Sequence, residues 1–166
     1  MMNEHLGWSF ILIIAMATLI ISLRWPGVAK IIWVAFIARI VVLLLGYYFV
    51  TLPDSDGDAL GFEIIAWEWA QDDSIGLLDR FRGPHTYFLS WILGVLYSLS
   101  DRSILMAQSV SVLFGVGTVF SGWLLAVRLW GERTATKAGW VLALFPTLIL
   151  YSALTMREPF VLFFLM

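Results

Sequence analysis

Carboxylates gather in one short stretch of the sequence, directly after a long apolar segment. Asp54, Asp56 and Asp58 alternate with small residues in the turn-forming stretch 53–58. Carboxylate oxygens can hold a divalent cation, and a carboxylate can also accept the proton of an attacking hydroxyl. The same spacing fits a capping box formed by Ser55 and Asp58 at a helix start. A chemical site and an ordinary helix start are both compatible with these residues.

A second acidic position, Glu158, stands between two apolar segments near the other end of the sequence. Charge placement, described below, puts this position on the same side of a membrane as the cluster at 53–58. Glu158 could therefore supply a second oxygen ligand to a shared ion. The alternative is a helix start, because Pro159 suits the first turn of a helix and a carboxylate is stabilised near a helix N-terminus.

Basic residues in two places could bind an anion. Arg39 stands inside an apolar segment, and a cation at that depth usually faces protein or a water-filled cavity and is functional by default. Its long side chain could also snorkel to the membrane surface. Arg80, Arg82 and His85 form the second set, which could bind a phosphate through guanidinium forks or form an ordinary solvated patch.

The composition identifies the medium in which these residues must be positioned. Hydrophobic residues make up 61% of the chain and charged residues 13%, with a mean hydropathy of +0.90. In a soluble domain roughly half of the residues are hydrophobic and a quarter are charged. We therefore predict an all-α fold, a polytopic bundle of transmembrane helices. The net charge of −2 argues against a nucleic-acid surface. The lack of cysteine excludes disulfides, cysteine–zinc sites and thiol catalysis.

Four apolar segments are long enough to cross a bilayer, namely 6–23, 31–52, 103–127 and 138–154. The segment 87–99 is shorter, and we expect it to lie along or dip into the membrane surface without crossing. A further segment starts at Pro159 and reaches only Met166, which predicts that the chain is the N-terminal part of a longer protein. Residues 1–166 are predicted to form one membrane-embedded region, with an acidic loop at 53–102.

Charge asymmetry predicts which ends of the helices face the cytoplasm. Lys and Arg of short loops stay on the cytoplasmic side of a cell membrane. The connections at 24–30 and 128–137 are basic, whereas the loop 53–86 is rich in carboxylates. The acidic loop and the N-terminus are therefore predicted to lie outside the cytoplasmic (inner) membrane.

Within the acidic loop, residues 59–71 are predicted to form an amphipathic helix at the membrane surface. Phe62, Ile65 and Trp69 recur on one face, as an interfacial helix requires. Glu63 and Glu68 fall off that apolar face.

Two blocks of the sequence resemble a known family of membrane enzymes. The first is RIVVLLLG at 39–46, followed by PDSDGDALGFEIIAW at 53–67. The second is LAVRLWGER at 125–133, followed by ALFPTLILYS at 143–152 and then by Arg157 and Glu158. This arrangement resembles the N-terminal third of the GT-C membrane glycosyltransferases, a superfamily that includes protein O-mannosyltransferase-like and lipid A aminoarabinose transferase-like proteins.

The resemblance implies transfer of a sugar from a polyprenyl-phosphate-linked donor at the outer membrane face. It implies that Asp58, or Asp56, is the catalytic base and that Asp58 and Glu158 share a divalent metal ion, Mg or Mn. The predicted phosphate-binding residues are Arg80, Arg82, His85 and Arg39. The implied partners are membrane lipid, the donor lipid, and helices of a C-terminal part or a second subunit, with no nucleic acid.

Two other functions remain compatible with the sequence. A fragment of a transporter would also place carboxylates at a membrane mouth, with Arg39 lining the transport pathway. A non-catalytic membrane subunit would use the same apolar helices to bind a larger partner.

The predicted topology can be tested by labelling, because the chain contains no cysteine. Single cysteines at Ser74 and at Thr134 should fall on opposite sides of the membrane. A membrane-impermeant thiol reagent added to intact cells should label the cysteine at position 74 and spare that at position 134. The reverse pattern would contradict both the topology and an outer-face site.

Overall fold

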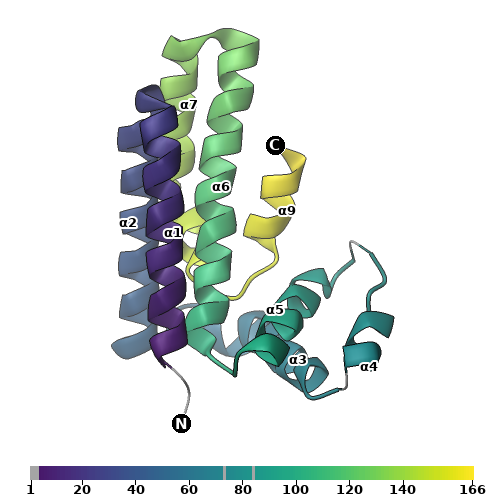
Figure 1. Ribbon diagram of the computed structural model, residues 1–166. Coiled ribbons are helices and arrows are strands. Elements are labelled where there is room, and N and C mark those ends of the chain that lie inside the picture. The colour runs from purple at the N-terminus through teal and green to yellow at the C-terminus, as the bar shows by residue number, and fades with distance from the viewer. Residues whose placement is uncertain (1–3, 73, 84) are drawn as a thin grey trace.

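The computed structural model describes residues 4–72, 74–83 and 85–166, and every regular element in this part of the chain is a helix (Figure 1). Three of these helices are long and apolar enough to cross a membrane. They are α1 (Glu4–Arg24), α2 (Pro26–Tyr48) and α6 (Ile104–Trp130). A fourth span is formed by the pair α7 (Glu132–Leu144) and α8 (Pro146–Ser152) if the pair is counted as one. The predicted all-α membrane fold is confirmed.

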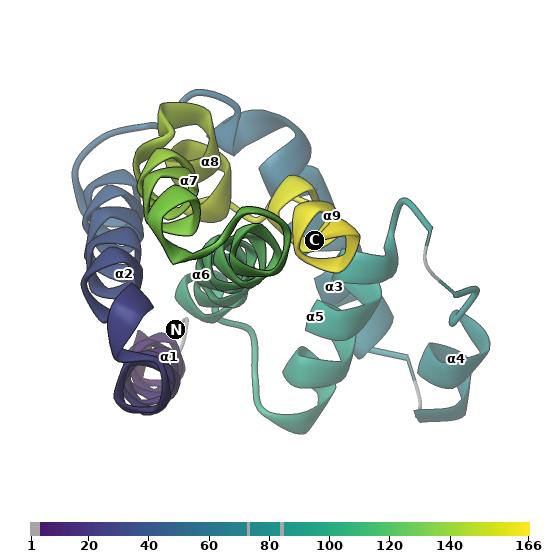
Figure 2. The ribbon, with the colours of Figure 1, turned by 90° about the horizontal axis from the view of Figure 1, so that it is seen from above.

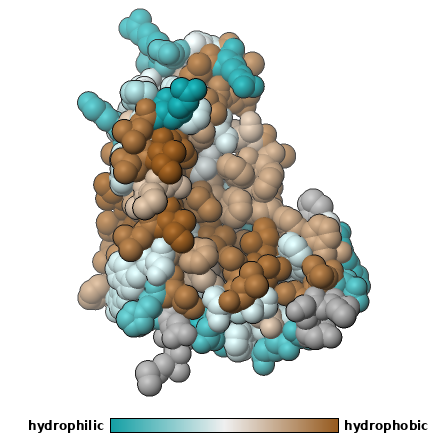
Figure 3. All heavy atoms as spheres, viewed as in Figure 1, coloured by the Kyte–Doolittle hydropathy of each residue, from teal (hydrophilic) through white to brown (hydrophobic). Residues whose placement is uncertain are grey.

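The helix α6 lies at the centre of the bundle and contacts α1, α2, α7, α8 and α9 (Glu158–Leu165) (Figure 2). The two basic turns, between α1 and α2 and between α6 and α7, lie at the same end of the bundle (Figure 1). Hydrophobic residues form a broad band between the two hydrophilic ends (Figure 3). This distribution of polar residues is the one expected of a bundle that sits across a bilayer.

The helix α2 begins and ends earlier than the predicted segment 31–52. It starts at Pro26, because proline lacks a backbone N–H and fits the first turn of a helix. It ends at Tyr48, after which the backbone N–H groups of Phe49 and Val50 both bond to the carbonyl of Leu45. The chain therefore leaves the bundle before the acidic stretch begins.

Four short helical elements lie together at the opposite end of the bundle from the basic turns (Figure 1). They are η1 (Ser55–Ala59), α3 (Leu60–Ala70), α4 (Ser74–Asp79) and α5 (Phe88–Leu99). The helices α3 and α5 pack against each other. Both ends of α5 stay at this end of the bundle, as predicted for the segment 87–99, and α9 rises from the same end beside α6 (Figure 1).

The fourth span is bent by 57° at Phe145, whereas the segment 138–154 was predicted as one span. Pro146 causes the break, because it has no N–H to donate to the carbonyl of Leu142, four residues earlier. In an apolar bundle such a carbonyl needs another donor. The guanidinium of Arg39 supplies it, with Nη2 3.5 Å from the Leu142 oxygen and Nη1 3.2 Å from the Ala143 oxygen.

The side chain of Arg39 is thus held inside the bundle and is 1% exposed. Its Nη1 also donates to the carbonyl of Ala35 in its own helix, at 3.0 Å. The alternative in which Arg39 snorkels to the membrane surface is wrong, because the guanidinium is occupied by backbone carbonyls between α2 and the end of α7. A cation is also favourable beside a helix C-terminus, where the helix dipole is negative.

This arrangement predicts that substitutions of Arg39 and Pro146 have interdependent effects on the stability of the protein. Arg39→Met should destabilise the protein, since each buried carbonyl left without a donor costs about 1–3 kcal/mol. Pro146→Ala restores an N–H that can bond to Leu142, so Arg39→Met should cost less in that background. Thermal unfolding in detergent of the two single variants and the double variant measures this difference. Lys30→Met, which changes an exposed cation, is the control, and an equal loss in both backgrounds would contradict the capping role.

Candidate functional site

The acidic turn and the link before α9 meet at one cavity of about 270 Å³. Asp58 comes from η1, Phe62 from α3 and Tyr87 from the start of α5, whereas Arg157 precedes α9. A carboxylate and a guanidinium from distant parts of the sequence therefore line the same space. The cavity lies at the end of the bundle where η1 and α3 gather.

The local backbone presents Asp58 to this cavity. Asp54 adopts a left-handed conformation (φ 66°), which Asp tolerates better than most residues, and it turns the chain into η1. Neither η1 nor α3 has a side-chain hydrogen bond at its N-cap, so the capping box between Ser55 and Asp58 does not form. Asp56 is exposed and is not among the residues that line the cavity. Of the two predicted bases, Asp58 is the one placed to act on a bound ligand.

Arg157 is the residue that sequence reasoning overlooked in favour of its neighbour. Its guanidinium lies 5.9 Å from the ring centroid of Phe62, over the cavity wall. Its contact with Glu158 is long, 3.9 Å, and both side chains are substantially exposed, so this pair is weak. Arg157 is therefore available to bind an anion beside Asp58. Only its position next to a predicted ligand could have indicated this from the sequence.

That Asp58 and Glu158 share a metal ion stays a prediction. Glu158 does not line the cavity of Asp58, and one of its carboxylate oxygens is buried without a hydrogen-bond partner. No group of three or more His, Asp or Glu side chains with metal-binding geometry occurs in the described part of the chain. The cavity offers one carboxylate beside a guanidinium, a donor set that suits an anionic ligand better than a divalent cation.

A second cavity of about 280 Å³ continues from the first, and the two share Thr86 and Arg157. His85 lines this second cavity, together with Phe88 and Phe160. The second cavity leads to an apolar groove of about 400 Å³ between α5 and α9. The described residues that line the groove are all apolar, namely Phe88, Phe160, Val161, Phe164 and Leu165. The cavities thus join a polar end to an apolar groove that follows α9 along the bundle.

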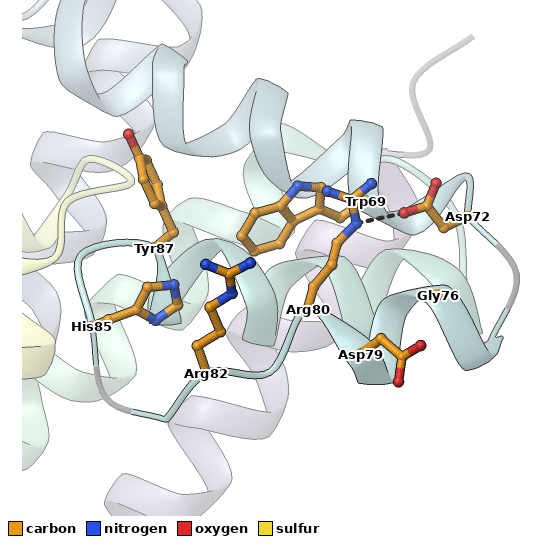
Figure 4. A pocket seen from close by; sticks show the side chains of 8 residues that line it. All are labelled: Trp69, Asp72, Gly76, Asp79, Arg80, Arg82, His85 and Tyr87. Atoms are coloured by element: carbon orange, nitrogen blue, oxygen red, sulfur yellow. Dashed lines mark hydrogen bonds and ion pairs between the residues drawn. The ribbon is translucent and has the colours of Figure 1, made fainter.

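The predicted basic set is brought together in a polar hollow of about 660 Å³ (Figure 4). Arg80 is paired with Asp72 at 2.6 Å and lies 5.4 Å from the ring centroid of Trp69. Arg82 points into the hollow and forms no ion pair with the described residues (Figure 4). His85 Nδ1 lies 2.9 Å from the Gly83 carbonyl, which can only accept, so Nε2 is the free nitrogen. Arg39, the fourth predicted phosphate ligand, lies apart from this set, inside the bundle.

A buried charged cluster that the sequence did not indicate holds α3 in place. Glu63 is 1% exposed, although it falls off the apolar face expected for this helix. Its carboxylate accepts two hydrogen bonds from Arg102, at 2.7 and 3.0 Å, and one from the Tyr97 hydroxyl at 3.0 Å. Tyr97 and Arg102 follow Glu63 by 34 and 39 residues, so no local spacing could have revealed the contact.

Burial and the neighbouring Glu63 carboxylate raise the pKa of Tyr97 well above its ordinary value. The folded protein therefore retains the Tyr97 proton at a pH at which the unfolded chain loses it. By linkage, this contribution to stability is fully present below the unfolded pKa of about 10 and is lost at higher pH.

Comparisons with known proteins do not add a family to this description. No family model matches the chain, and neither a curated protein nor a solved structure is significantly similar to it. The glycosyltransferase resemblance therefore stays a prediction drawn from the residues.

The buried cluster predicts a large difference between two arginine substitutions. Arg102→Met should destabilise the protein by about 3 kcal/mol, because it leaves the buried Glu63 carboxylate without its cation. Arg80→Met removes an exposed ion pair and should cost no more than about 1 kcal/mol. Adding Glu63→Gln to Arg102→Met should recover part of the loss, since a neutral amide is easier to bury. Thermal unfolding in detergent measures all four proteins, and equal effects of the two arginine substitutions would contradict the assignment.

Proposed function

We propose that this chain forms the donor-binding and catalytic part of a membrane glycosyltransferase. The enzyme would take a sugar carried on a polyprenyl phosphate and transfer it to an acceptor hydroxyl at the outer face of the cytoplasmic membrane. The observation that supports this proposal is the continuous series of cavities from Asp58, past Arg157 and His85, to the apolar groove on α9. The charge distribution of the loops supports the outer orientation.

The polarity of these cavities matches an amphiphilic donor. An isoprenoid chain needs an apolar surface, which Phe88, Phe160 and Phe164 provide between α5 and α9. The phosphate of the donor would then lie beside Arg157 and His85, where the apolar groove ends and polar side chains begin. A guanidinium suits this task, because its planar fork donates two hydrogen bonds to phosphate oxygens. The sugar would extend past Arg157 toward Asp58.

The proposed reaction is a displacement at the anomeric carbon. The acceptor oxygen attacks this carbon while the bond between the carbon and the phosphate oxygen breaks, and the polyprenyl phosphate leaves with the bonding electron pair. Asp58 accepts the proton of the acceptor hydroxyl. Arg157 stabilises the negative charge that grows on the leaving phosphate. We assign each of these steps to a side chain of the cavity.

The two alternative functions have less support. The transport hypothesis depended on Arg39 lining a pathway, but this guanidinium is bonded to carbonyls beside a cavity of only about 10 Å³. A non-catalytic subunit would give no role to the cavity that Asp58 and Arg157 line together.

Substitution of the proposed base tests the reaction. Asp58→Asn keeps the size of the side chain and removes the base, so transfer should fall about 10²-fold or more. Asp54→Asn is the matched control, because Asn also tolerates the left-handed conformation at this exposed position. The assay supplies membranes containing the protein with a panel of polyprenyl-phosphate-linked sugars and measures the release of polyprenyl phosphate. Undiminished release by Asp58→Asn would exclude Asp58 as the base, and Asp56→Asn would then be tested.

A further inference from the structure

The polar hollow lies beside the proposed donor path but differs from it in chemistry. It shares Tyr87 with the cavity of Asp58 and His85 with the cavity that follows. The apolar groove opens from the second of these cavities. A donor lipid seated along Arg157 and the groove would therefore leave the polar hollow open to another ligand. Its volume, about 660 Å³, is within the usual range for small-molecule sites, roughly 300–1,000 Å³.

None of the described residues that line the hollow has an aliphatic side chain. Two aromatic rings, Trp69 and Tyr87, meet edge to face with centroids 6.3 Å apart. The other side chains are all polar, namely Asp72, Asp79, Arg80, Arg82 and His85. A lipid tail would find little to bind here. These side chains suit a saccharide, because its C–H faces pack on aromatic rings and its hydroxyl groups exchange hydrogen bonds with carboxylates and guanidinium groups.

The charges of the side chains in the hollow favour a saccharide over a phosphate as its ligand. Arg80 is neutralised by Asp72 at 2.6 Å, and this pair forms one wall of the hollow (Figure 4). Arg82 and Asp79 have opposite charges and form no ion pair with the described residues. They leave one strong donor and one strong acceptor for a ligand. A hydroxyl-rich neutral molecule can use both, whereas a phosphate could use Arg82 but would be disfavoured beside the Asp79 carboxylate.

We propose that this hollow is a saccharide-binding subsite, in which Arg82 and Asp79 bind sugar hydroxyls beside the rings of Trp69 and Tyr87. If the proposed transfer reaction holds, on which this role depends, the saccharide is part of the acceptor and its reacting hydroxyl reaches Asp58 past Tyr87. In this proposal Arg82 binds sugar hydroxyls where the sequence predicted phosphate binding, and phosphate binding is assigned to Arg157.

Direct binding tests the subsite without relying on transfer. The purified protein in detergent is applied to immobilised oligosaccharides that end in mannose, glucose or galactose. The parent protein should bind at least one of them, and Arg82→Gln and Asp79→Asn should each weaken that binding at least ten-fold. Both substitutions change exposed residues, so the variants should remain folded, and their thermal unfolding verifies this. Arg133→Gln, an exposed arginine beyond the opposite end of α6, should bind as the parent does.

Three outcomes would overturn the proposal. They are binding of none of the oligosaccharides by the folded protein, equal binding by Arg82→Gln and the parent, and displacement of the bound oligosaccharide by inorganic phosphate at equal concentration. Saccharide binding combined with no loss of transfer in Asp58→Asn would instead uphold the subsite and reject the proposed base. The two proposals can therefore fail separately.

Discussion

A break in a membrane helix needs hydrogen-bond donors, and in this protein Arg39 supplies them. Without water in the apolar core, the carbonyls released by Pro146 must bond to another protein group. Arg39 reaches them from α2, so a residue of the second helix stabilises the break that Pro146 makes between α7 and α8. Gly115 of α6 makes room for this junction, because a side chain there would collide with Ser152 and crowd the Arg39 guanidinium.

The course of the chain after the break determines the position of the site. Leu154 and Met156, in the link that follows α8, are buried in one cluster with Ala59 of η1. This packing brings Arg157 to the cavity of Asp58. From the other side, α3 is held by the contact of Glu63 with Arg102 and by the Ser90 hydroxyl, which donates to the Phe62 carbonyl at 2.9 Å. Two buried polar contacts therefore hold the site together. The contact of Arg39 stabilises the break that precedes Arg157, and the contact of Glu63 holds α3.

The sequence predicted the spans well because long apolar runs need no tertiary information. It also indicated Asp58 and Arg39 as unusual positions. It could not predict that Arg39 and Pro146 act together, because the carbonyls of Leu142 and Ala143 lie more than a hundred residues further along the chain than Arg39. The burial of Glu63 was not predicted, because an amphipathic pattern treats every carboxylate as exposed, whereas a buried one is stable if a distant cation reaches it.

Binding of a lipid phosphate tests the central claim most directly, namely that Arg157 and the apolar groove form one site. Native mass spectrometry of the detergent-solubilised protein can compare a polyprenyl monophosphate with the corresponding uncharged polyprenol. The phosphate should be retained in preference to the alcohol, and Arg157→Gln should abolish that preference while leaving weak binding of both chains. Equal retention of the two lipids by the parent protein would contradict the account.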